Sequence, residues 1–289
     1  MKKIAPGVYV ETGYTLVTVG AVLTGQGWVC IDTPPYPREA RHWRAALQEI
    51  SPAPFCYIIV TDAHRDRVLG NAWFEAPVVA HESAARQILS LKETFISQVA
   101  DEMSANDNEF VELASVKLSL PEVSFDQALH LMCDDREITV ISKPSATAGN
   151  AWVLLPEEKI AFVGDAIVTD RHPSLRDTTS KAWLNALAEI RHGRYASWTM
   201  IPGRGSVPRS LDVEPLAEYL RVARRRVNSL RRAGRPRSEI STLVPELLSF
   251  FPVRRAERDE VQRRIKVSLE AIYEELGRRD EDKKPESRA

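Results

Sequence analysis

The most informative part of the chain is residues 58–71, with the sequence IIVTDAHRDRVLGN. Residues 57–60 are continuously apolar and rich in β-branched side chains, which is typical of a short strand buried on both faces. This strand leads directly into a polar loop that contains Asp62, His64, Asp66 and Arg67. Loops of this kind gather functional groups at one edge of the sheet in layered α/β proteins.

Two later segments repeat the arrangement of a buried strand followed by a polar loop. Residues 160–163 (IAFV) lead into Gly164 and Asp165, and Met200 and Ile201 lead into a turn that carries Arg204. Alternating apolar residues over 7–33 predict two or three further strands. Helical spacing predicts one long helix over 82–104, and a strand is expected near 111–118.

The last third of the chain is expected to be helical and basic. Residues 209–289 hold 20 Lys/Arg and 15 Asp/Glu, whereas residues 1–208 hold 19 Lys/Arg and 25 Asp/Glu. The net charge of −1 is therefore the sum of an acidic first part and a basic last part. Apolar stripes run through 216–230 and 261–276. Because the arginines alternate with apolar positions and have acidic neighbours at helical spacing, they indicate helix surface and not nucleic-acid binding.

Composition excludes several classes of protein. The chain has 289 residues, 44% of them hydrophobic, which is enough for a folded core. No apolar run approaches the ~20 residues of a membrane-spanning helix. The three cysteines are widely spaced and predict reduced thiols, and no signal-peptide core follows Met1, so we expect a cytoplasmic protein without a membrane partner.

The chain resembles the metallo-β-lactamase superfamily, in which a buried strand leads into the motif Thr-His-x-His-x-Asp-His. The resemblance covers about residues 5–208 and continues in order through VGAVLTGQGWVCIDT at 19–33, VAHE at 79–82, SATAG at 145–149, LPEEKIAFVGD at 155–165, RHP at 171–173 and IPGRG at 201–205. It implies an α/β fold, specifically an αββα metallo-β-lactamase-like sandwich, with a C-terminal helical extension. We therefore expect a metallo-β-lactamase-like domain over 1–208, a helical region over 209–277 and a disordered tail over 278–289.

The resemblance also implies seven metal-ligand positions, and this chain keeps only some of them. His64, Asp66 and the bridging Asp165 are unchanged, and Asp62 offers an oxygen where the family has a histidine. The remaining histidine positions correspond to Ala146, Arg67 and Arg204, none of which can coordinate a metal.

Arg67 and Arg204 would place permanent positive charges where the second metal ion of the family lies. Unit charges ~4 Å apart interact by ~4 kcal/mol at an effective dielectric constant of 20, and a divalent ion doubles this repulsion. We therefore expect no second ion. The hypothesis is that both guanidinium groups replace the metal charge by pairing with Asp66 and Asp165.

Two functions remain open from the sequence. The first is a metal-free pseudoenzyme or small-molecule-binding protein, descended from a hydrolase. The alternative is a mononuclear hydrolase of small anionic substrates, in which Asp62, His64 and Asp165 hold one zinc, iron or manganese ion. In that alternative the candidate catalytic residues are Asp66, Asp165 and His64, and the substrate anion would bind Arg67 and Arg204. The C-terminal helices are expected to cover the sandwich or to form a homodimer interface.

Overall fold

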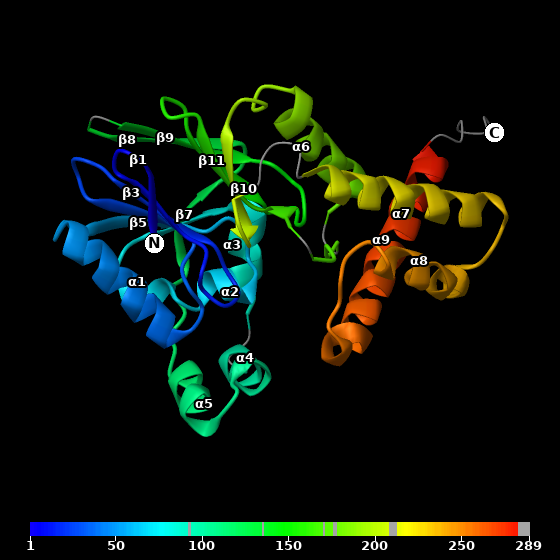
Figure 1. Ribbon diagram of the computed structural model, residues 1–289, viewed down its shortest axis with the longest axis horizontal. Coiled ribbons are helices and arrows are strands. Elements are labelled where there is room, and N and C mark those ends of the chain that lie inside the picture. Colours follow the sequence, from blue (N-terminus) through cyan, green and yellow to red (C-terminus); the bar gives the residue numbers. More distant parts are fainter. Residues whose placement is uncertain (92–93, 135, 170, 176–177, 208–212, 283–289) are drawn as a thin grey trace, which may run out of the picture. The chain divides into compact units, whose positions relative to one another are not determined.

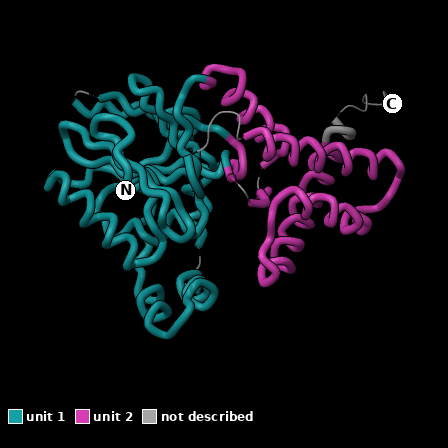
Figure 2. The backbone as a smooth tube through the Cα atoms, in the orientation of Figure 1, with its two compact units in different colours: residues 1–143, 149–167, 197–209 teal, residues 144–148, 168–196, 210–289 magenta. Residues whose placement is uncertain are grey.

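The computed structural model describes residues 1–91, 94–134, 136–169, 171–175, 178–207 and 213–282. They form two compact units, shown in different colours in Figure 2. The first unit comprises residues 1–143, 149–167 and 197–209, and the second comprises residues 144–148, 168–196 and 210–289.

The first unit contains two β-sheets (Figure 1). The first sheet has its strands in chain order, antiparallel from β1 to β4 and parallel from β4 to β7. Its strands are β1 (Lys2–Ala5), β2 (Val8–Glu11), β3 (Val19–Leu23), β4 (Trp28–Ile31), β5 (Phe55–Ile59), β6 (Val78–His81) and β7 (Pro121–Phe125).

The second sheet has the strand order β12-β11-β10-β9-β8, and the neighbours from β8 to β11 are antiparallel. Its strands are β8 (Ala128–Cys133), β9 (Arg136–Ser142), β10 (Ala151–Leu155), β11 (Ile160–Val168) and β12 (Thr199–Arg204). All residues of β10 and β11 are buried. This burial explains the continuous apolar run at 160–163. The polar loop expected at Gly164 and Asp165 is wrong, because β11 continues through both residues to Val168.

The two sheets pack face to face because alternate residues of each strand point to opposite sides. Val29 of β4 clusters with Val153 of β10 and Phe162 of β11. The next residue, Cys30, points the other way and clusters with Trp43 of α1 (Pro37–Ile50). The predicted α/β sandwich of two packed sheets, with a C-terminal helical region, is thus confirmed.

The expected single helix over 82–104 is wrong, because α3 (Glu82–Leu89) and α4 (Phe95–Met103) are separate helices. Helix α3 ends at Ser90, whose backbone N–H bonds back to the carbonyl groups of the last turn. Apolar residues at helical spacing on both sides of this end produced the appearance of one helix. The first unit also contains α2 (Arg65–Val68) and a short 3-10 helix, η1 (Asn71–Phe74).

The strand expected near 111–118 is also wrong, because α5 (Asp107–Ala114) occupies the first half of this segment and no strand follows it before β7. The helix begins with a capping box: Asn106 Oδ1 accepts a hydrogen bond from Glu109 N at 3.1 Å. In return, Glu109 Oε2 accepts one from Ala105 N at 2.8 Å. The first bond satisfies an N–H group that the helix itself leaves unbonded, and the second holds the residue before the cap against the first turn.

The second unit contains most of the longer helices that follow β11. Its helices are α6 (Ser180–His192), α7 (Glu214–Arg232), η3 (Arg237–Leu243), α8 (Val244–Leu248), η4 (Arg255–Glu257) and α9 (Arg258–Asp282). Helix α9 continues past Gly277, where the sequence predicted a stop and a disordered tail. A Cβ atom at Gly277 would lie 3.0 Å from Arg231 Nη1, so this glycine makes room for a side chain instead of ending the helix. The rest of the predicted tail, 283–289, lies outside the described residues.

A buried polar cluster joins three helices of the second unit. Glu275 of α9 accepts hydrogen bonds from Ser180 N at 2.8 Å and from Ser180 Oγ at 2.5 Å, and it pairs with Arg224 Nη1 of α7 at 2.5 Å. Only 5% of the Glu275 side chain is exposed. The arginine would therefore be left with an uncompensated charge if the carboxylate were removed.

Replacing Glu275 by alanine is therefore expected to lower the free energy of unfolding of the second unit by about 3–5 kcal/mol. Chemical denaturation followed by helical circular dichroism measures this change. Glu274→Ala is the matched control, because the neighbouring Glu274 makes an exposed pair with Arg237. Exposed pairs contribute at most about 1 kcal/mol. Equal effects of the two substitutions would contradict the prediction.

The compact units do not follow a single linear boundary. The second unit also takes in residues 144–148 and 168–196, which the sequence analysis placed with the first domain. The domain division at residue 208 therefore stays a prediction. In the described part of the chain, no helix combines the length and apolar character needed to cross a membrane.

Candidate functional site

The loop after β5 is held by an aspartate that follows β4. Asp32 Oδ1 accepts a hydrogen bond from Thr61 N at 2.8 Å, and Asp32 Oδ2 accepts one from Thr61 Oγ1 at 2.7 Å. Asp32 has a φ of 54°, in the left-handed region that aspartate tolerates better than most residues. Asp62 Oδ1 in turn accepts a hydrogen bond from His64 N at 2.9 Å. These bonds fix the direction of the loop that carries the candidate site.

Arg67 lies completely buried beneath this loop. Its Nη2 is 2.6 Å from Asp165 Oδ1, and its Nη1 donates to the carbonyl oxygen of Gly203 at 3.0 Å. Its Nε lies 3.5 Å from Asp32 Oδ2. A Cβ atom on residue 203 would lie only 2.3 Å from Arg67 Nη2, so glycine is required there for the guanidinium to approach the backbone.

Arg204, at the end of β12, bridges two carboxylates. Its Nη1 is 2.5 Å from Asp66 Oδ2, and its Nε lies 3.1 Å from both oxygens of Asp165. The same Nη1 donates to the carbonyl oxygen of Leu16 at 2.8 Å. The contacts expected among Asp66, Asp165 and the two arginines are therefore present, and this region does not fit a second metal ion.

Asp62, His64 and Asp165 form a group that does fit one metal ion. One ligand atom from each residue lies within 4.8 Å of the others. His64 Nδ1 is 3.0 Å from Asp62 Oδ2 and 3.5 Å from Asp165 Oδ2. Asp62 Oδ2 and His64 Nδ1 are both buried atoms that pair with each other, and neither makes a well-aligned hydrogen bond to another described residue. Such atoms are costly unless an ion, a proton or a ligand satisfies them.

The charges of the site point to the same region. Four carboxylates, those of Asp32, Asp62, Asp66 and Asp165, lie around two guanidinium groups. The cluster therefore keeps two negative charges when His64 is neutral. One divalent ion, or in part a proton on His64, would offset this excess.

The pKa shifts follow from this arrangement. Burial alone would raise the pKa of Asp165, but the charges of Arg204 and Arg67 outweigh it and hold that pKa below its usual range. Burial likewise opposes ionisation of Asp62, and the neighbouring His64 lowers its pKa. The negative charge of Asp62 raises the pKa of His64 to about 9. Burial raises the pKa of Asp32 to about 6.

We expect the imidazole of His64 to titrate near pH 9 in chelator-treated protein, as measured by NMR. Because its pKa is raised above the unfolded value, the pair with Asp62 stabilises the fold fully below about pH 6.5. That contribution is lost as the pH rises through about 9. Asp62→Asn should move the titration back toward the ordinary value, and a wild-type titration near pH 6.5 would contradict the assignment.

The structure brings all of the predicted site residues of the first unit together, but it restricts their roles. Arg67 was expected to bind a substrate anion, yet its guanidinium is buried and committed to protein acceptors, so this conformation does not offer it to a ligand. Arg204 keeps 19% of its side chain exposed. Ala146 belongs to the second unit, and its methyl group supplies no ligand atom. The catalytic roles of Asp66, Asp165 and His64 stay predictions.

Sequence reasoning missed two groups that hold the site together. Asp32 was seen only as the end of a strand, although an aspartate that closes a buried strand beside a second polar loop is a usable signal. The carbonyl group of Leu16, which binds Arg204, carries no signal in its side chain and could not have been found.

The described part of the chain thus contains a two-sheet α/β sandwich with a cluster of ionisable side chains beside the ends of its strands. A model of the metallo-beta-lactamase superfamily matches residues 13–205. The chain therefore belongs to the metallo-beta-lactamase superfamily.

Solved structures with low sequence identity share the fold. The chain is similar to the sec-alkylsulfatase Pisa1 from Pseudomonas sp., with 15% identity and a TM-score of 0.67 over 94% of this chain and 49% of that one. It therefore spans about half the length of that sulfatase. A metallo-beta-lactamase family protein from Thermus thermophilus is 18% identical, with a TM-score of 0.66. The match covers 96% of this chain and 95% of that one. The metallo-beta-lactamase FIM-1 from Pseudomonas aeruginosa, in its mono-zinc form, is 18% identical, with a TM-score of 0.57. The match covers 76% of this chain and 94% of that one.

Proposed function

We propose that the chain is a hydrolase of small anionic molecules that works with a single divalent metal ion, held by Asp62, His64 and Asp165. The observation that carries this proposal is that ligand atoms of Asp62, His64 and Asp165 converge within 4.8 Å of one another. Carboxylate oxygen and imidazole nitrogen suit zinc, iron or manganese. A structural neighbour, FIM-1, is known in a mono-zinc form.

The metal ion would lower the pKa of a bound water and polarise a substrate oxygen. The chain's own residues would do the rest. Asp62 orients the His64 ring, and 38% of the His64 side chain is exposed, so a small molecule can approach the site from this side. Asp66 pairs with Arg204 through Oδ2, and it would orient the attacking water. Arg204 is the guanidinium that an anionic group could reach, because Arg67 is buried.

A metal-free ligand-binding protein, or pseudoenzyme, is the second candidate. It is favoured by the raised pKa of His64, because an imidazolium between Asp62 and Asp165 offsets one negative charge without any ion. In this state the two arginines would supply the positive charge that metals supply elsewhere in the superfamily. The small-molecule site would then bind without hydrolysis.

Elemental analysis separates the two candidates. The full chain is purified without chelator, incubated with Zn²⁺, Fe²⁺ or Mn²⁺, desalted and analysed for metal per chain. We expect one ion in the wild type and a large loss in His64→Ala. His130→Ala is the matched control, because His130 lies on the exposed strand β8. A wild type that retains no metal after loading would overturn the one-metal proposal in favour of the metal-free candidate.

A further inference from the structure

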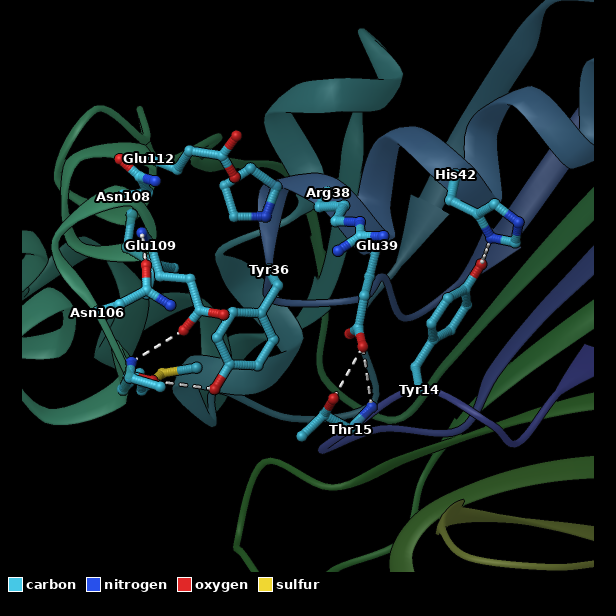
Figure 3. Close-up of a pocket in the computed structure, with 14 residues that line it drawn as sticks. Tyr14, Thr15, Tyr36, Arg38, Glu39, His42, Asn106, Asn108, Glu109 and Glu112 are labelled. Atoms are coloured by element: carbon cyan, nitrogen blue, oxygen red, sulfur yellow. Dashed lines mark hydrogen bonds between the residues drawn. The ribbon is translucent and has the colours of Figure 1, made fainter.

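The first unit has a cavity of about 740 Å³ that contains none of the residues of the charged cluster. It lies between the loop over residues 12–18, the first turns of α1 and the helices α4 and α5 (Figure 3). Its volume is that of a typical small-molecule site. Tyr14 and Tyr36 present aromatic rings to it, and Met103 and Leu113 add apolar surface.

Two carboxylates flank the ring of Tyr36 in this cavity. Figure 3 shows Glu109 on one side of Tyr36 and Glu39 on the other. Burial of Tyr36 raises the pKa of its phenol, the charges of Glu109 and Glu39 raise it further, and the charge of Arg65 opposes them. Glu39 Oε1 accepts a hydrogen bond from Thr15 Oγ1 at 2.8 Å, whereas its Oε2 has no hydrogen-bond partner among the described residues.

These two carboxylates lack a cationic partner among the described residues. The third glutamate of the cavity, Glu112, is different because it pairs with Arg41 at 3.0 Å. Glu109 uses Oε2 to cap α5, which fixes its position without neutralising its charge. Arg38 is the cation among the lining residues, and it is exposed at the surface. The cavity thus combines two carboxylates that form no ion pair among the described residues with aromatic walls.

We propose that this cavity binds an alkylammonium group, with the cation between Glu39 and Glu109 and its hydrocarbon chain along the tyrosine rings. Aromatic faces attract ammonium groups, and a carboxylate strengthens the attraction. The group can belong to a free amine or to a lysine side chain of a peptide. This site is separate from the proposed metal centre and does not depend on it.

Isothermal titration calorimetry of the full chain at low salt tests the proposal with matched probes. Pentylamine carries the expected ammonium group, 1-pentanol is its neutral counterpart, and glutarate carries the opposite charge. We expect pentylamine to bind at least tenfold more tightly than either control and its affinity to fall as salt screens the charges. Nα-acetyl-lysine amide distinguishes the two sources: tighter binding than pentylamine supports a peptide ligand, and weaker binding supports a free amine.

Substitutions locate the binding. Glu39→Gln and Glu109→Gln should each weaken pentylamine binding on the order of tenfold, which corresponds to 1.4 kcal/mol. Glutamine can keep the capping interaction of residue 109, so α5 should stay folded. Glu49→Gln, at the exposed far end of α1, is the control and should have no effect. Equal binding of pentylamine and 1-pentanol, or unchanged affinity in both cavity variants, would overturn the proposal, whatever the metal content of the protein.

Discussion

Replacing Arg204 by histidine is expected to add one metal ion per chain to the amount that the wild type holds. The guanidinium of Arg204 lies between Asp66 and Asp165, where a second ion would need both carboxylates. A unit charge ~4 Å from a divalent ion costs ~8 kcal/mol at an effective dielectric constant of 20, so removing it has a large effect. A neutral imidazole also supplies a nitrogen ligand, which completes a set of three donors with Asp66 and Asp165.

Two further variants separate the loss of charge from the gain of a ligand. Arg204→Leu removes the charge and supplies no ligand, so its metal content should stay at the wild-type level. The double variant Arg204→His with Asp66→Asn should lose the added ion, because Asp66 is a ligand of that site alone. Elemental analysis after loading and desalting measures all of them. An Arg204→His protein with unchanged metal content would show that Arg67 alone excludes the second ion.

The sequence predicted most of the fold because its information is local. The buried runs at 57–60 and 160–163 have neighbours on both faces, and such strands are recognisable from their continuous apolar residues. Helix α5 was predicted as part of a strand, because apolar residues were given more weight than the Asn106 and Glu109 capping pair. That pair is a readable signal, and it would have corrected the prediction.

The candidate site was predictable in its members but not in its geometry. Charge balance alone indicated that Arg204 must lie against Asp66 and Asp165, and it does. Charge balance could not distinguish a buried arginine from an exposed one, so the burial of Arg67 was not foreseen. That burial depends on the close approach of Gly203, which brings together residues far apart in the chain.

Replacing Asp165 by asparagine is expected to lower the free energy of unfolding by about 3–5 kcal/mol, as for other buried pairs that lose one partner. Asp165 is bound by both Arg67 and Arg204, and Arg67 has no exposed surface. The substitution keeps the shape of the side chain but leaves two guanidinium groups without the carboxylate between them. Chemical denaturation of metal-free protein measures the loss. Asp134→Asn, at the exposed turn between β8 and β9, is the control.

A double-mutant cycle tests whether charge is the cause of this loss. If Asp165→Asn destabilises the fold by leaving the buried Arg67 guanidinium without its ion-pair partner, then adding Arg67→Met removes part of that cost, and the double variant should be more stable than the sum of the single effects predicts. If Asp165 acts only by filling space, the two effects should add. Because Arg67 and Asp165 are 2.6 Å apart and buried, we expect a coupling free energy of roughly 1–3 kcal/mol. Additive effects would mean that the arginines do not depend on Asp165, and they would remove the basis for regarding the pair as a replacement for a metal ion.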